Sequence, residues 1–446
     1  IPDLISGYER GGRGFLALHK GDPDAIFPHT VQAQRRRSKD RLRPEEVPPL
    51  RAMAGVFDLP EPAEFLAAGD FDNDGHMDVL AATAGGYSLS MLPGDGHGGF
   101  DAPLNLSLPG ALRQLAAGEF NRPDGLTDFV VAVDRRTGAE LLVFEDPEGA
   151  WKAEPESFEL KSSVAALALG DLDGDFLPDL SAAAEDDLVI VRGRDRKLSL
   201  GTAARATVRP ALVEHHPLVF NPVGLTFGSF GLTGTPALAL LADDGALHVA
   251  EASALDRPQL VSQGHPGARL LRAHTLGGKA DDLIALDQAG RQIEVHSGRS
   301  GLRQIDALTA PAKPVAALPM RLTSAATDSL VILQEGATSV ISVSQITVQS
   351  TFTVTNTADG GPGSLRQAIF DANGAPGTDM IDFSIPGSGV QTILLASPLP
   401  AIAGPVTIDA TTQPGFAGTP LVALEGAAAG PGADGLVVQP GDSLVR

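Results

Sequence analysis

The sequence predicts an all-β fold, and three observations carry this prediction. Short apolar segments such as FLAAG at 65–69 and VLAAT at 79–83 lie between glycines and acidic residues, which is typical of buried strands joined by tight turns. The 446 residues include 51 Gly and 34 Pro, but only 5% of the residues are aromatic. A unit of roughly 50 residues also recurs along the chain, which indicates a repeat architecture.

The composition excludes several classes of partner and site. The formal net charge of −22 opposes binding to a phosphate backbone, so we expect no nucleic-acid partner. The chain has no cysteine, which excludes disulfides, zinc–thiolate sites and thiol nucleophiles. It also has no apolar run of about 18 residues, so we expect no membrane span in this region.

Residues 70–78, DFDNDGHMD, have the spacing of a calcium loop. Gly75 stands sixth, where a chain that folds round a small cation needs a positive φ. An EF-hand would need Glu at the twelfth position, but Ala81 stands there, and the flanking strands indicate a β-hairpin turn. An acidic turn without an ion is the alternative. The expected calcium ligands are Asp70, Asp72, Asp74, the carbonyl of His76, and Asp78.

The same pattern recurs at 115–133 and 167–184, giving a second and a third acidic loop. In the third loop Phe176 takes the place of the glycine, so we expect a strained residue at positive φ. In the second loop Arg122 and Pro123 add one residue and a positive charge, which predicts a weaker site. Its expected ligands are Glu119, Asn121, Asp124 and Asp128. Those of the third loop are Asp171, Asp173, Asp175, the carbonyl of Leu177, and Asp179.

Each repeat also carries a second hairpin, which makes four strands in roughly 50 residues, the size of one propeller blade. Three weaker copies of the repeat follow the three acidic ones. Residues 1–27 match residues 76–100, so we expect the chain to open inside a repeat, after the innermost strand of that repeat. We therefore expect residues 1–348 to form a seven-bladed β-propeller. The missing inner strand either lies in upstream sequence or is supplied by residues 345–350.

Residues 28–50 are expected to be an insertion into the first blade. Six basic residues fall between Arg35 and Arg43. A charge run of this kind is typical of a solvated helix, and contact with a polyanion is the alternative.

A second domain is expected at 349–446, where Thr, Gly, Pro and Ala dominate. The segment 363–374, GSLRQAIFDANG, predicts a helix with Ser364 as its N-cap and Gly374 just past its end. Short strands separated by Gly and Pro follow it. The apolar face of this helix would consist of Leu365, Ala368, Ile369 and Ala372.

The three acidic loops, set after LAAG or LALG, resemble the FG-GAP or VCBS repeats of integrin-α-like β-propellers over about residues 1–345. This resemblance implies calcium ions that stiffen individual blades, while other loops contact ligands. Residues 349–446 look like the capping start of a right-handed parallel β-helix of large bacterial surface proteins. We accordingly expect a piece of a longer exported protein, located outside the cell or on a bacterial cell surface.

The expected function is a calcium-binding scaffold for adhesion or ligand binding, with a protein or carbohydrate ligand at the propeller loops. The chain has no G-x-S-x-G, no HExxH and no phosphate-cradling glycine loop, so we expect no enzyme in this region. One alternative is a polysaccharide hydrolase or lyase that uses the propeller or the truncated β-helix. Another is a spacer whose partners bind elsewhere.

Overall fold

The computed structural model divides into two compact units, Ile1–Ser344 and Gln345–Arg446, here called unit 1 and unit 2. The expected boundary at 348/349 falls within 345–350, outside the described residues. No helix among the described residues is long and apolar enough to cross a membrane. The structure describes residues 3–40, 48–230, 234–275, 280–287, 289–297, 302–310, 312–322, 327–336, 342–344, 351–375, 379–403, 406–430, 433–438 and 443–446.

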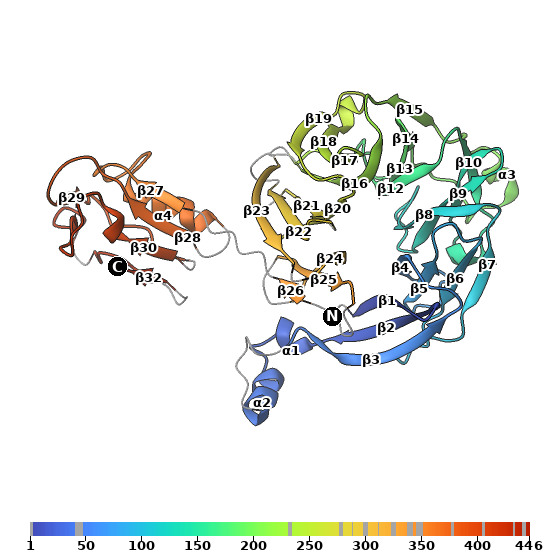
Figure 1. Cartoon of the computed structure of the whole chain (residues 1–446), viewed down its shortest axis with the longest axis horizontal. Coiled ribbons are helices and arrows are strands. Elements are labelled where there is room, and N and C mark those ends of the chain that lie inside the picture. The colour runs from blue at the N-terminus through green and yellow to red at the C-terminus, as the bar shows by residue number, and fades with distance from the viewer. Residues whose placement is uncertain are drawn as a thin grey trace. The chain divides into compact units, whose positions relative to one another are not determined.

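Unit 1 is an all-β propeller in which antiparallel sheets fan out around a centre (Figure 1). Each four-stranded sheet runs outward from its first strand, as β4 to β7 do (Figure 1). The first two of these sheets consist of β4 (Phe65–Gly69), β5 (Asp78–Ala82), β6 (Ser88–Leu92) and β7 (Leu104–Ser107), then β8 (Ala111–Gly118), β9 (Asp128–Arg135), β10 (Gly138–Phe144) and β11 (Glu156–Leu160). The next consists of β12 (Val164–Gly170), β13 (Asp179–Ala184), β14 (Asp187–Val191) and β15 (Val213–Pro217).

Two further four-stranded sheets and two three-stranded sheets complete unit 1. The four-stranded ones are β16 (Pro222–Gly228), β17 (Ala237–Ala242), β18 (Ala246–Glu251) and β19 (Gln259–Gln263), then β20 (Arg269–Ala273), β21 (Asp282–Asp287), β22 (Gln292–Ser297) and β23 (Arg303–Thr309). The three-stranded ones are β1 (Leu4–Arg10), β2 (Arg13–Gly21) and β3 (Leu50–Leu59), and β24 (Pro314–Met320), β25 (Ser329–Gln334) and β26 (Ser342–Ser344).

The expected count of seven blades is wrong, because only five of the described sheets in unit 1 have the four strands of a blade. As expected, no described strand lies inside β1 in its sheet. Leu4, Leu322 and Val331 share one buried cluster, so the two three-stranded sheets pack against each other and close the ring. The alternative in which residues 345–350 supply the missing strand concerns residues outside the described part of the chain.

The second strands of the blades are apolar runs because neighbouring sheets cover them on both faces. All residues of β5 and β13 are buried, as are the first six of β9. A strand that is covered on both faces reads as a continuous apolar run and not as an alternating one. The expected strand at 65–69 is confirmed, and the one expected at 79–83 is shifted by one residue, since β5 runs from Asp78 to Ala82.

The insertion after β2 contains two helices, α1 (Pro23–Ile26) and α2 (Val31–Asp40). The expected helix in the basic segment is therefore confirmed for its first part, whereas residues 41–47 lie outside the described residues. Arg36 reaches back to Asp24, with 2.7 Å between Nε and Oδ2. Short helical turns also occur at η2 (Ala150–Lys152), α3 (Thr202–Arg205) and η3 (Ala252–Ala254).

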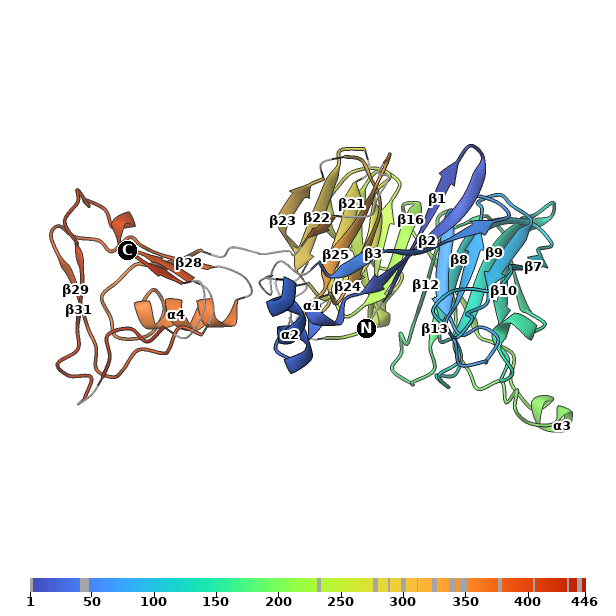
Figure 2. The same cartoon turned by 90° about the horizontal axis from the view of Figure 1, so that it is seen from below.

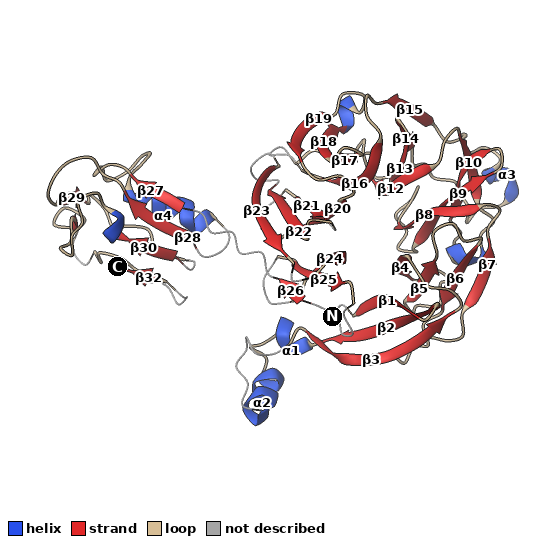
Figure 3. Ribbon diagram, viewed as in Figure 1, coloured by secondary structure: helices blue, strands red, loops and turns tan. Residues whose placement is uncertain are grey.

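Unit 2 has parallel sheets beside one helix (Figure 3). Its helix α4 (Leu365–Gly374) begins as expected, since Ser364 Oγ accepts the Gln367 N–H at 3.2 Å, but it includes Gly374. Its expected apolar face lies in the core of unit 2. One sheet has the order β27 (Thr351–Val354), β28 (Asp379–Phe383), β30 (Val406–Asp409) and β32 (Leu444–Val445); β29 (Gln391–Leu394) pairs with β31 (Val422–Glu425), and η5 (Ala410–Thr412) follows β30.

Replacing Ser364 with Ala should destabilise α4 by about 1 kcal/mol, because the side chain satisfies an otherwise unpaired amide of the first turn. Faster hydrogen exchange of the α4 amides, measured by mass spectrometry on the whole chain, would report this loss. Ser397→Ala, at an exposed serine of the same unit, serves as the control. Equal exchange rates in both variants would contradict the capping role.

Candidate metal centre

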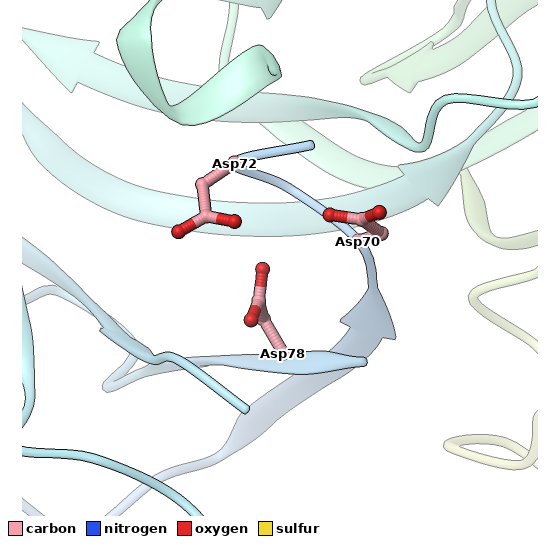
Figure 4. A group of neighbouring side chains, drawn as sticks. All are labelled: Asp70, Asp72 and Asp78. Carbon is pink, nitrogen blue, oxygen red and sulfur yellow. The ribbon is translucent and has the colours of Figure 1, made fainter. Parts of the chain in front are cut away.

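The first acidic loop joins β4 to β5 and brings three of its carboxylates together. Asp70, Asp72 and Asp78 each place a carboxylate oxygen within 4.8 Å of the others. Their carboxylates converge on one space in Figure 4. Hard cations such as calcium prefer oxygen ligands of this kind, so the donor set fits the expected ion.

Backbone amides of the loop organise this group. Asp70 accepts the N–H groups of Asp74 at 3.2 Å and Gly75 at 2.9 Å, which wraps the loop around its carboxylate. The wrapping needs two left-handed residues, Asn73 at φ 59° and Gly75 at φ 85°. A glycine at the second of these positions, as expected from the sequence, adopts that conformation without strain.

Asp78 closes the loop from the start of β5 and is fully buried. Its carboxylate accepts the N–H groups of Phe71 and Gly94, both at 2.9 Å. Gly94 has no room for a side chain, because a Cβ there would lie 2.6 Å from the Met77 carbonyl oxygen. Burial raises the pKa of Asp78 above its ordinary value, although these two hydrogen bonds oppose the rise.

Asp72 provides the local observation that most favours a cation at this loop. Its Oδ1 is buried and has no hydrogen-bond partner. Burial raises the pKa of Asp72, and the neighbouring Asp74 charge raises it further, while Lys152 acts in the opposite direction. A buried carboxylate oxygen without a partner is costly, and a bound cation would satisfy it.

The remaining expected ligands of this loop lie differently. Asp74 is not a member of the three-carboxylate group, and its Oδ1 accepts the His76 N–H at 2.8 Å. His76 is exposed, and its ring contacts the turn after β6, since a Cβ at Gly96 would lie 2.7 Å from His76 Nε2. The structure thus brings together three of the five residues.

The third loop repeats the geometry but adds a cation of its own. Asp171, Asp173 and Asp179 again have carboxylate oxygens within 4.8 Å of one another. Arg192, the residue after β14, places Nη1 3.2 Å from Asp179 Oδ2 and 3.8 Å from Asp173 Oδ2. This guanidinium neutralises part of the acidic group, so the third loop depends less on a metal ion than the first.

The other expected residues of the third loop shape its turn. Asp175 lies outside the group of three, and its Oδ1 accepts the Leu177 N–H at 2.8 Å. Burial raises the pKa of Asp175, and the nearby Asp173 and Asp171 add to the rise. Phe176 has a φ of 67° and is 80% exposed, so the expected residue at positive φ is confirmed. A bulky side chain is strained in that region.

The second loop does not assemble a comparable group. Asn121 is fully buried, and both ends of its amide have protein partners: Nδ2 donates to Glu145 Oε2 at 2.7 Å, and Oδ1 accepts the Arg194 N–H at 3.1 Å. Glu119 accepts the Asp124 N–H at 3.0 Å, and Asp124 accepts that of Leu126 at 3.0 Å. These residues therefore hold the turn together, and they form no group of three within 4.8 Å among the described residues.

Asp128 closes the second loop and accepts the Phe120 N–H at 3.0 Å. Burial raises its pKa to about 8, and the charge of Glu145 contributes to the rise. Glu145 also has a raised pKa, chiefly through burial. A neutral Asp128 is a poor metal ligand, which makes the second loop the weakest of the three candidates at neutral pH.

The residue directly after the third strand of each blade distinguishes the three loops. This position is Pro93 in the sheet of the first loop, Glu145 in that of the second and Arg192 in that of the third. The position lies outside the acidic motif, so the spacing of the acids does not reveal it. Aligning the third strands of the three sheets, each with the residue that follows it, shows the difference in charge at this position.

No protein-family model matches the chain, and no curated protein matches it significantly. Three solved structures of similar fold are each 12% identical to the chain. BBS1N in complex with ARL6DN, soaked with lead, has a TM-score of 0.47, and the match covers 74% of this chain and 88% of that chain. The Dos1 propeller has a TM-score of 0.42 with 73% and 74% covered, and the WD40 domain of Toxoplasma gondii coronin has a TM-score of 0.45 with 75% and 76% covered. Similarity at this level shows no function.

Replacing Arg192 with Gln should make the third loop dependent on calcium. Removal of the guanidinium leaves Asp179 buried without its charged partner, which costs about 1–3 kcal/mol in chelator. Calcium should recover part of that loss, as measured by urea unfolding with and without the ion. The control is Arg113→Gln, which breaks the more exposed Arg113–Asp134 pair. An Arg192 variant with no greater calcium response than the wild type would contradict this role.

Asp128 predicts a pH dependence with a definite sign. Its pKa is about 8 in the folded protein and ordinary when unfolded, so the folded state holds the extra proton between about pH 4 and 8. Stability should therefore fall as pH rises through this window. In chelator, Asp128→Asn should flatten the fall relative to wild type and to Asp101→Asn, at an exposed residue. The free energy of unfolding, measured at pH 5, 7 and 9, tests this pH dependence. If stability falls equally with pH in Asp128→Asn and in the wild type, the role of Asp128 is contradicted.

Proposed function

We propose that unit 1 is a calcium-stabilised scaffold whose other loops bind a protein or carbohydrate ligand in adhesion. The observation that supports it is the buried, unpartnered Oδ1 of Asp72 inside a group of three convergent carboxylates. In this proposal calcium stiffens the hairpin of β4 and β5 and takes no part in chemistry. The proposed location is outside the cell or on a bacterial surface.

The proposal also assigns a repeat family to unit 1 and the start of a β-helix to unit 2. The repeated acidic loops support membership of the FG-GAP or VCBS propellers. The parallel pairing of β27, β28 and β30 beside a capping helix supports the start of a parallel β-helix in unit 2. We assign no catalytic residue in this region.

The calcium part of the proposal is tested by Asp72→Asn, which keeps the side-chain shape and removes the charge. If the dissociation constant is about 0.1–1 mM, then 1 mM calcium should stabilise the wild type by about 0.4–1.4 kcal/mol. The midpoint of thermal unfolding would rise by roughly 1–3 °C. Asp72→Asn should lose most of this rise, and Asp58→Asn, at an exposed residue, should retain it.

Two results would overturn the calcium assignment: a wild-type midpoint that calcium leaves unchanged, or an equal rise in the Asp72 variant. The ligand-binding part needs a separate measurement. The intact chain, immobilised on beads, should retain polysaccharides or surface proteins more strongly in calcium than in chelator. Absence of retention under both conditions would contradict the adhesion role.

A further inference from the structure

The long connection between β14 and β15, residues 192–212, lines a cavity of about 360 Å³ that is open to solvent. Its other wall includes Glu156, the first residue of β11 in the preceding sheet. Figure 2 shows α3, in this connection, displaced from the strands of the propeller. The other four-stranded sheets have shorter connections at this place, such as residues 93–103 between β6 and β7.

Positive charge gathers in this cavity although the chain is strongly acidic, with a formal net charge of −22. Four guanidinium groups and one carboxylate line it, which leaves a surplus of positive charge at the wall. Such a concentration in an acidic protein opposes the field of the rest of the molecule and favours a bound anion. The charged lining residues are Glu156, Arg194, Arg196, Arg205 and Arg209.

Two of the four arginines are held in place by carboxylates. Arg194 Nη2 lies 2.5 Å from Glu156 Oε1, and Arg196 Nε lies 3.3 Å from Glu156 Oε2. Arg196 also reaches Glu145, with 3.2 Å between Nη1 and Oε2. These pairs neutralise Arg194 and Arg196 and make them a rigid floor for the cavity.

Arg205 and Arg209 supply the charge that is left over. Both are exposed, and among the described residues neither guanidinium makes an ion pair with a carboxylate. The Arg209 carbonyl accepts Arg194 Nε at 2.9 Å, which ties this part of the connection to the floor. In addition, Arg194 Nη1 is buried and has no hydrogen-bond partner. A buried donor without an acceptor indicates a group that is completed by a ligand.

The geometry points to a binding site for a sugar that carries a phosphate or sulfate group. Two free guanidiniums match the charge of a tetrahedral dianion, and guanidinium forks bind such oxyanions with paired hydrogen bonds. Leu198, Val208 and Pro210 add apolar surface, against which the CH groups of a sugar ring pack. A cavity of about 360 Å³ exceeds the size of a lone oxyanion and lies in the range of small-ligand sites.

The site is distinct from the first acidic loop, so it binds its ligand whether or not calcium stabilises the protein. Glucose 6-phosphate and glucose 6-sulfate are the probes, and glucose is the uncharged reference. Isothermal titration of the whole chain, in chelator and at low ionic strength, should show saturable binding of at least one charged probe and none of glucose. Binding should weaken as salt is added, because exposed charges are screened.

Arg205→Gln with Arg209→Gln should weaken that binding at least about tenfold and leave the thermal midpoint unchanged, since both side chains are exposed. Arg136→Gln with Arg269→Gln removes the same charge from exposed positions elsewhere and should bind as the wild type does. The proposal is overturned if neither charged probe binds, if glucose binds equally well, or if both double variants bind alike. Preference for one charged probe identifies the anion.

Discussion

The buried aspartate that opens the second strand of a blade is the constraint on which the inner hairpins depend. Asp78, Asp128 and Asp179 each accept the N–H of the residue that follows the first acid of their loop. Those residues, Phe71, Phe120 and Leu172, are buried between sheets. One carboxylate therefore fixes the turn and also anchors an apolar side chain in the core between neighbouring sheets.

This constraint is independent of metal binding. In the sheet of β20 to β23, His274 stands where the first acid of the loop would be, yet Asp282 still accepts the Thr275 N–H at 3.0 Å. A buried amide without an acceptor costs about 1–3 kcal/mol, which gives Asp282 a structural role in a loop that lacks the first acid. In the sheet of β16 to β19 the corresponding position is Ala237, so this device is not used in every blade. Calcium in the first loop would therefore add to a hairpin that already has its hydrogen bonds.

The three acidic loops show how one hairpin takes different countercharges. The first loop leaves a buried oxygen of Asp72 without a partner, the second raises the pKa of Asp128 to about 8 through burial, and the third places Arg192 beside Asp179. The arrangements of the second and third loops relieve the repulsion between clustered carboxylates by different physical means, whereas that of the first loop favours a bound cation. The same long connection that begins with Arg192 also gathers the arginines of the anion cavity, so one insertion changes both the charge of the loop and the surface beside it.

The sequence by itself determined the all-β class, the repeated hairpins, the three acidic loops, the positive φ of Phe176 and the capped helix of unit 2. These features depend on residues that are near one another in the chain, where strand runs, turn glycines and caps leave a readable pattern. Only the tertiary structure decided that Asn121 accepts a hydrogen bond from the Arg194 amide and that Arg192 forms an ion pair with Asp179 of the third loop. It also decided that two three-stranded sheets close the ring. Asn121 and Arg194 are 73 positions apart, and a contact over such a separation depends on how blades pack, which local pattern does not encode.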